Sequence, residues 1–191
     1  GKIVSDKECG LIVVNRNIKE RGKRRFVIAH EIGHFKIENH TEHECKKEDL
    51  SFEAKVVKER AANKFAAELL MPEEYFREMT RERINDDNDA YTLINSAAAL
   101  FNVTITSAGI RYAEIGEKPI ALILSVGGKI KWSVINENFP YQIIPKNSFI
   151  SNKTYAGLIL SGNKVSYIKE KAINSRAWFQ NEETIKGKDQ L

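Results

Sequence analysis

The stretch FVIAHEIGHFKI, residues 26–37, sets the fold expected for this chain. It is apolar on most faces, which is typical of a helix buried by its neighbours, and it predicts a helix over residues 25–38. His30 and His34 lie one turn apart on that helix, with Glu31 beside the first histidine. Burying an unpaired carboxylate among apolar side chains costs free energy. The three polar residues are therefore either hydrogen-bonded core residues or part of a metal site.

The spacing His-Glu-x-x-His favours the metal site, because it places both imidazoles on one helix face within reach of one ion. Zn²⁺ accepts imidazole nitrogens at about 2.0–2.1 Å and keeps an open position for water in catalytic sites. A carboxylate beside the first histidine can take a proton from that water and pass it to a leaving amine. The pattern predicts His30 and His34 as zinc ligands and Glu31 as the catalytic base. Gly33, between the two ligands, allows another backbone to approach closely.

A third zinc ligand has to come from another segment, and a glutamate on a following helix would complete a two-histidine, one-glutamate site. We expect that helix to end at Leu70, because residues before a proline such as Pro72 disfavour helix. It carries three glutamates, Glu53, Glu59 and Glu68. Glu59 is preferred because it lies one turn before Asn63, whose side chain can hydrogen-bond a ligand histidine. The polar loop at 38–49 offers three alternatives, His40, His43 and Cys45, for which an exposed loop is the favoured interpretation.

Upstream of the first helix, GLIVVN (10–15) predicts a β-strand. If this strand lies at a sheet edge beside the metal, it can bind an extended peptide by strand addition, and the residues concerned would be Leu11, Val13 and Asn15. The following segment, 16–25, holds six basic residues and one acid. It is predicted to be a solvated turn that leads into the helix.

The remainder of the chain divides into helical segments and a β-rich end. Short helices are expected at 73–79 and over 90–115, with a break near 102–104 and Thr104 or Thr106 as the cap. The segment 90–115 is similar to a helix-turn-helix, but few basic residues begin its second helix, so we expect it to pack internally rather than bind DNA.

After Gly116 the pattern changes to short β-like runs. Two of them flank Gly127-Gly128, which predicts a hairpin. Further strands are expected at 141–145 and 154–162, followed by a helical piece at 173–179. The prediction is therefore an α+β chain, with a mainly helical metallopeptidase-like lobe that has a short β edge over 1–115. A small β-rich lobe with a frayed tail follows over 116–191.

The composition of the chain restricts its expected partners and its cellular location. The net charge of +4 is mild and does not indicate nucleic acid. The two cysteines, Cys9 and Cys45, are too few for a disulfide framework and fit a reducing cytosol. No apolar run approaches the roughly 20 residues that span a bilayer, and no secretion signal is visible at the N-terminus. We expect a cytoplasmic protein with no membrane partner and no direct contact with DNA.

Two motifs together resemble a known family. FVIAHEIGH (26–34) and ERAANKFAAELLMP (59–72) are similar to the ImmA/IrrE metallopeptidases, and the second motif is much more specific than the first. The segment ALFNVT (99–104) and Arg111 also fit the family pattern. The resemblance extends over about residues 10–115.

This resemblance implies a zincin-like lobe in which zinc is held by His30, His34 and Glu59, with Glu31 as the base. It also implies that the substrate is a helix-turn-helix repressor, whose cleavage releases a mobile element or a stress regulon. An alternative is an anti-repressor that sequesters its regulator without cleavage and holds a structural zinc. A second alternative is a DNA-binding regulator that uses residues 93–115 and the basic turn. Peptide hydrolysis also needs a side chain that stabilises the negatively charged oxygen of the intermediate. The candidates are Tyr75, Tyr91 and Arg111, and no spacing argument selects one of them.

Overall fold

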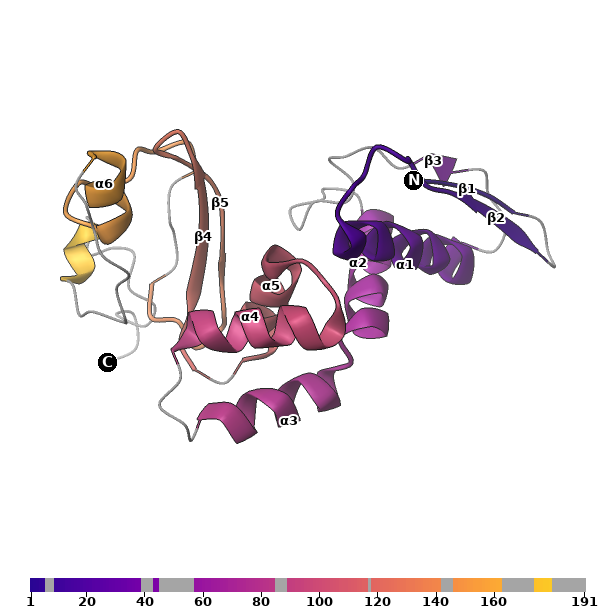
Figure 1. Cartoon of the computed structure of the whole chain (residues 1–191), viewed down its shortest axis with the longest axis horizontal. Coiled ribbons are helices and arrows are strands. Elements are labelled where there is room, and N and C mark those ends of the chain that lie inside the picture. The colour runs from indigo at the N-terminus through magenta and orange to yellow at the C-terminus, as the bar shows by residue number, and fades with distance from the viewer. Residues whose placement is uncertain are drawn as a thin grey trace, which may run out of the picture. The chain divides into compact units, whose positions relative to one another are not determined.

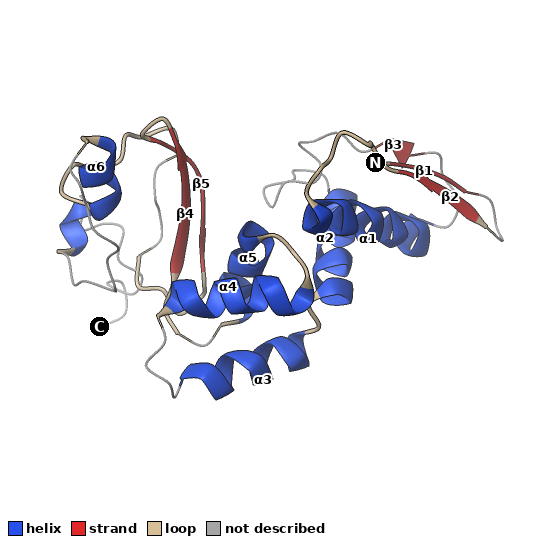
Figure 2. Ribbon diagram, viewed as in Figure 1, coloured by secondary structure: helices blue, strands red, loops and turns tan. Residues whose placement is uncertain are grey.

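The computed structural model describes residues 1–5, 9–38, 43–44, 57–84, 89–116, 118–141, 146–162 and 174–179, and the statements below refer to these residues. Backbone contacts divide the chain into two compact units, Gly1–Arg111 and Tyr112–Leu191, and each is described by itself. The chain is α+β, as predicted, with helices and short strands in both units (Figures 1 and 2). The predicted boundary after residue 115 lies at the end of the helix that spans this division.

A small antiparallel sheet in the first unit consists of β1 (Lys2–Ser5), β2 (Gly10–Val13) and β3 (His43–Glu44), in the order β2-β1-β3. Ile3 pairs with Ile12 and is 2% exposed, so one face of the sheet covers the core. Val4 pairs with Leu11, and both side chains are exposed on the other face. The strand predicted at 10–15 is confirmed as β2 at a sheet edge, whereas β1 was not predicted.

The two longest helices of the described residues, α1 (Arg21–Glu38) and α2 (Val57–Leu70), pack against each other and hold the polar residues of both motifs. Their closest approach is at Gly33, where an added Cβ would lie 3.1 Å from the Cα of Ala62. The predicted start of the first helix at residue 25 is wrong, because α1 begins at Arg21. Gly22 is tolerated inside it because the backbone of Val103 and Thr104 fills the space where a side chain would be.

Three further helices complete the first unit or lead out of it: α3 (Glu73–Ile84), α4 (Ala90–Phe101) and α5 (Ile105–Ile115). Asn102 ends α4 in the left-handed conformation at φ 55°, and Arg25 of α1 donates hydrogen bonds to the carbonyls of Phe101 and Asn102. Thr104 caps α5 by accepting a hydrogen bond from the backbone N–H of Ser107, as predicted. Within the described residues, no single helix meets the length and hydropathy of a membrane span, although the pair α4 and α5, bent by 114°, meets them jointly.

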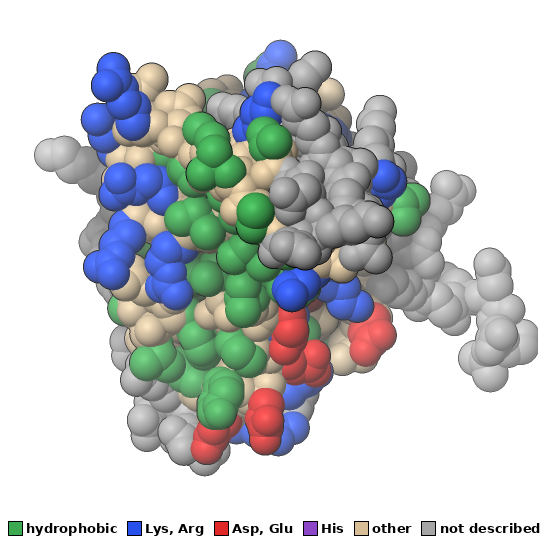
Figure 3. Space-filling view, turned by 90° about the vertical axis from the view of Figure 1, so that its right-hand side faces the viewer, with side chains coloured by type: hydrophobic (Ala, Val, Ile, Leu, Met, Phe, Trp, Pro, Cys, Tyr) green, Lys and Arg blue, Asp and Glu red, His purple; other side chains and the backbone are tan. Residues whose placement is uncertain are grey.

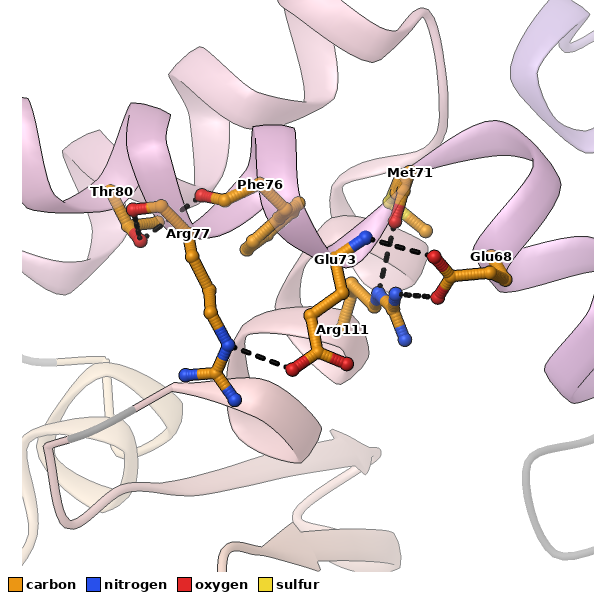
Figure 4. Close-up of polar contacts among 7 residues, drawn as sticks. All are labelled: Glu68, Met71, Glu73, Phe76, Arg77, Thr80 and Arg111. Atoms are coloured by element: carbon orange, nitrogen blue, oxygen red, sulfur yellow. Dashed lines mark hydrogen bonds and ion pairs between the residues drawn. The ribbon is translucent and has the colours of Figure 1, made fainter.

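Arg111 of α5 holds the corner between α2 and α3 (Figure 4). Its Nε donates to the carbonyl of Met71 at 3.1 Å, and its guanidinium forms an ion pair with Glu68. The other oxygen of Glu68 accepts a hydrogen bond from the backbone N–H of Glu73 at 3.0 Å, which satisfies one of the orphan donors at the start of α3. Arg111 is 4% exposed and two of its nitrogen atoms contact residues of this corner, so we assign it a structural role rather than the stabilisation of an oxyanion.

The second unit contains the predicted hairpin, formed by β4 (Ala121–Val126) and β5 (Lys129–Ile135). Gly127 and Gly128 make its turn at φ 58° and 75°, a conformation that glycine adopts without strain. The strand expected at 154–162 is wrong, because α6 (Tyr155–Leu160) is a helix capped by Thr154. A 3₁₀ turn at Ser175–Ala177 lies where a last helical piece was expected, and the strand predicted at 141–145 falls mostly outside the described residues.

The core of the first unit lies under the sheet and between the helices. Phe76 and Phe101 stack within it, with ring centroids 5.6 Å apart. Small residues line the helix contacts, so the backbones approach closely around the buried polar residues described next. The most deeply buried apolar side chains are Ile3, Val27, Ala29, Ala62, Ala66, Met71, Phe76, Leu93, Ala97 and Ala108.

Candidate metal centre

Two helices bring the polar residues of the two sequence motifs together. His30, Glu31 and His34 come from the middle of α1, and Glu59 and Asn63 come from the facing side of α2. The two histidines and both carboxylates are almost completely buried, at 0–3% exposure. Charged groups are rarely buried in this way unless they are paired or bind a metal. A shared ligand set is the simplest reason for their position.

His30, His34 and Glu59 direct one donor atom each to a common point. The Nε2 atoms of His30 and His34 are 3.0 Å apart, and they lie 3.2 and 3.3 Å from Oε2 of Glu59. Zinc bonds of about 2.05 Å in a tetrahedron require donors about 3.3 Å apart. The observed triangle is close to one face of that tetrahedron. The chemistry and spacing of these three donors therefore fit a zinc ion, with one coordination position left for water or substrate.

Asn63 sets the tautomer of His30. Its Oδ1 lies 2.9 Å from Nδ1 of His30, and because an amide oxygen can only accept, Nδ1 must carry the proton. The lone pair of the ring then lies on Nε2, the atom that points to Glu59 and His34. The hydrogen bond predicted for Asn63 is thus present in the structure, and it prepares His30 as a metal ligand.

The pKa of His30 also favours metal binding. The pKa of His30 is lowered from 6.5 to about 4, chiefly by burial and then by the neighbouring His34, and the carboxylate of Glu59 and the hydrogen bond with Asn63 oppose this shift only in part. A ring with this pKa is neutral near pH 7 and keeps its lone pair for a metal. This is the protonation state that a histidine ligand requires.

Glu31 is completely buried beside the ligand set, one residue after His30. The amino nitrogen of Gly1 lies 3.8 Å from its Oε1, and residue 1 also packs against Val27, one helical turn earlier. A carboxylate at this position can exchange a proton with a molecule at the open coordination position. The contact with residue 1 was not predicted, and no sequence pattern signals it.

The remaining predicted site residues have different outcomes. Leu11 and Val13 lie in the edge strand β2 with side chains 66% and 52% exposed, whereas Asn15 lies beyond its end. Asn15 instead forms a turn, in which its side-chain oxygen accepts a hydrogen bond from the backbone N–H of Asn17. Tyr75 and Tyr91 are largely exposed.

The alternative zinc ligands are not part of the described centre. Glu68 pairs with Arg111 instead. The residues His40, Cys45 and Glu53 and the side chain of His43 lie outside the described residues.

The described structure thus unites the residues of both sequence motifs in one buried centre. The family model for the IrrE N-terminal-like domain of the M78 peptidases matches residues 4–112, more than half of the chain. The chain belongs to this family. The matched region of this M78 member contains all three metal-site donors together with Glu31 and Asn63, and it confirms the resemblance identified from the sequence motifs. A comparison with curated proteins gives no match.

Proposed function

We propose that this M78 family member is a zinc-dependent endopeptidase. The observation that carries the proposal is the buried triangle of His30, His34 and Glu59, whose donor atoms are 3.0–3.3 Å apart, with the carboxylate of Glu31 adjacent. Two neutral imidazoles and one carboxylate are the ligand set of catalytic zinc sites of the thermolysin type. A structural zinc site usually has four protein ligands and no spare carboxylate beside it.

In this proposal each residue has a defined role. When bound, zinc supplies a Lewis acid that lowers the pKa of water and polarises a carbonyl group. Glu31 takes the proton of the attacking water on a carboxylate oxygen and later gives it to the nitrogen of the departing amine. Asn63 holds the ring of His30 in one orientation through Nδ1.

The proposed substrate is a helix-turn-helix repressor, and we place the reaction in the cytoplasm, where such repressors act. Support comes from the family resemblance and from β2, which pairs with β1 on one side only among the described strands. An edge strand can bind an extended polypeptide through its backbone groups. The exposed side chains of Leu11 and Val13 would then lie beside alternate substrate residues.

The proposal is tested with a helix-turn-helix regulator from the organism that carries this gene. The regulator is incubated with the zinc-loaded protein, with the Glu31→Gln variant and with the wild-type protein plus a chelator, and the products are analysed by mass spectrometry. We expect one cut with the wild type, and in both controls a loss of at least about 10²-fold in rate, the usual contribution of a general base. Zinc content of the variant, measured by atomic emission, should stay near one ion per chain. An intact regulator that forms a stable complex with wild type and Glu31→Gln alike would refute the peptidase and favour sequestration.

A further inference from the structure

A cavity of about 340 Å³ lies beside the N-terminal half of α1, in the first unit. Its apolar walls are Phe26, Val27 and Ile105, of which Val27 is completely buried and Ile105 is half exposed at the margin. The polar residues Thr106 and Ser107 also line the cavity. This volume is at the lower end of the range for ligand pockets. An apolar floor with a few hydroxyl groups suits one or two apolar side chains of a polypeptide.

The cavity lies on the same face of α1 as the metal centre. Lys23, Val27 and Glu31 follow one another at intervals of four residues, so they line up along one side of the helix. With a rise of 1.5 Å per residue, Lys23 and Val27 lie about 12 and 6 Å from Glu31 along the axis. An extended polypeptide spans these distances with about two to four residues. Residue 1 packs against both Val27 and Glu31, so the cavity wall and the proposed catalytic base are separated by the width of one residue.

Exposed basic side chains surround this end of α1, and we call them the basic rim. The basic rim consists of Arg16, Lys19, Arg21, Lys23 and Arg24. Glu20 is the only acidic residue between positions 16 and 25, and no ion pair joins the basic rim to another described residue. Figure 3 shows one face of the molecule, on which Lys and Arg side chains gather along one side of a hydrophobic patch.

The position of the basic rim opposes the stability of α1. The first turn of this helix contains no acid, and cations at a helix N-terminus are electrostatically unfavourable. An acidic partner would remove this repulsion and gain attraction to five charges at once. The carboxylate of Glu20 on the cavity wall disfavours a phosphate inside the cavity itself. A polypeptide with an apolar side chain and acidic neighbours matches both the cavity and the basic rim, whereas a nucleic acid matches only the rim.

We infer that the cavity and the basic rim bind a segment of the substrate protein in which an apolar side chain is flanked by acidic residues. The inference rests on the proposed peptidase function and adds a substrate-docking surface to it. Arg25 takes no part, because its guanidinium is bonded to the end of α4. In this arrangement the cavity holds the apolar side chain, and Lys23 and Arg24 face the acidic residues beside it.

The binding test uses the full chain with Glu31→Gln, loaded with zinc, so that no probe is cleaved. The probe is a fluorescein-labelled peptide with a leucine between pairs of aspartates, followed by fluorescence anisotropy. We expect it to bind about tenfold more tightly than the same peptide with alanine for leucine or with lysines for the aspartates. The exchange Lys23→Glu with Arg24→Glu should weaken binding about tenfold, and a matched reversal in the second unit, Lys131→Glu with Lys153→Glu, should leave it unchanged.

Two further variants separate docking from folding. The acidic residues in Lys23→Glu with Arg24→Glu suit the N-terminus of α1, so this variant should melt no earlier than the wild type. Ile105→Ala shortens a half-exposed side chain. It should lower the affinity for the leucine peptide about threefold or more and leave the affinity for the alanine peptide unchanged. Equal affinity for all three peptides would refute the docking surface. The docking surface would also be refuted if a short DNA duplex bound more tightly than the leucine peptide and if this binding required Lys23 and Arg24.

Cleavage of the regulator distinguishes this inference from the proposed function. With Glu31 intact, Lys23→Glu with Arg24→Glu should raise KM about tenfold at unchanged kcat, because docking contributes to binding and not to proton transfer. Cleavage at an unchanged KM refutes the docking surface and leaves the peptidase standing. Binding of the leucine peptide as expected, with no cleavage by the wild type, refutes the peptidase and leaves the docking surface standing.

Discussion

Replacing Gly33 by alanine should weaken zinc binding without removing any ligand. The added Cβ would lie 3.1 Å from both Cα and the carbonyl oxygen of Ala62, and 3.3 Å from Cβ of Phe65. Carbon atoms in contact prefer about 3.5–4.0 Å. The helices α1 and α2 must therefore move apart by about 0.5 Å at this point. The movement acts on the ligand set directly, because Gly33 precedes His34 and Ala62 follows Glu59 by one turn.

The effect on the metal centre follows from the donor spacing. A shift of 0.5 Å would increase the separation between the histidine nitrogens and Oε2 of Glu59 from 3.2–3.3 Å to about 3.8 Å. Donors at this spacing correspond to tetrahedral bonds of about 2.3 Å, longer than the 2.0–2.1 Å of zinc–imidazole bonds. Zinc affinity should fall about 10–100-fold, the range found when the support of a metal ligand is disturbed. The free energy of unfolding of the metal-free protein should change little, because the gain in helix propensity of about 1 kcal/mol offsets much of the overpacking.

The assay is a competition titration of zinc against a chelating dye, with thermal unfolding of the metal-free and zinc-loaded protein in parallel. Gly22→Ala provides the matched control, because its Cβ would meet the backbone of Val103 at 2.7 Å, about 12 Å along the helix from His30. This control should lose about 1–3 kcal/mol of stability at unchanged zinc affinity. Unchanged zinc affinity in Gly33→Ala would refute the argument that this glycine sets the donor spacing.

Three further predictions concern single hydrogen bonds and one ion pair. Asn63→Ala should lower zinc affinity about 10–100-fold in the same titration, because Nδ1 of His30 loses its acceptor; an unchanged affinity would contradict the assigned tautomer. The pKa of Glu68 is raised by burial but lowered more by the N–H of Glu73 and by Arg111, so its net shift is downward from 4.5. The ionised carboxylate of Glu68 therefore stabilises the folded protein fully above pH 4.5, and this stabilisation is lost as the pH falls through the pKa of Glu68 in the folded state. Glu68→Gln should cost less than about 1 kcal/mol in denaturant unfolding at neutral pH, because the carboxylate is half exposed, and the difference should vanish in acid. Thr154→Ala should cost about 1–2 kcal/mol through loss of the α6 cap, measured by the same denaturation; no loss would show that α6 does not depend on this cap.

The metal centre was predictable because its ligands follow local rules. The spacing of His30 and His34 fixes their common face on any helix, and Glu59 stands one turn before Asn63. The sequence could not show how closely α1 and α2 approach, since this depends on two small residues, Gly33 and Ala62, in separate segments. The cavity was missed for a similar reason, because its walls come from parts of the chain about eighty residues apart.

The errors in secondary structure have specific physical causes. Gly22 and the basic residues around it indicated a turn, but the glycine lies in α1 because its missing side chain gives room to the backbone of residues 103–104. The run TYAGLILSG (154–162) is short and apolar, and such runs do not distinguish a strand from a buried helix. Thr154 favours the helix because its hydroxyl group donates a hydrogen bond to the carbonyl of Ser151 and accepts one from the backbone N–H of Gly157.

The complete burial of the metal centre has a kinetic consequence. His30 and Glu31 expose none of their surface and His34 only 2%, so a polypeptide cannot reach them in this conformation. In the proposed peptidase, each turnover therefore includes an opening motion, and the rate of that motion sets the upper limit of kcat. Zinc should exchange slowly with a chelator for the same reason. If the proposed activity is present, a metal centre that is closed most of the time would leave bystander proteins in the cell intact.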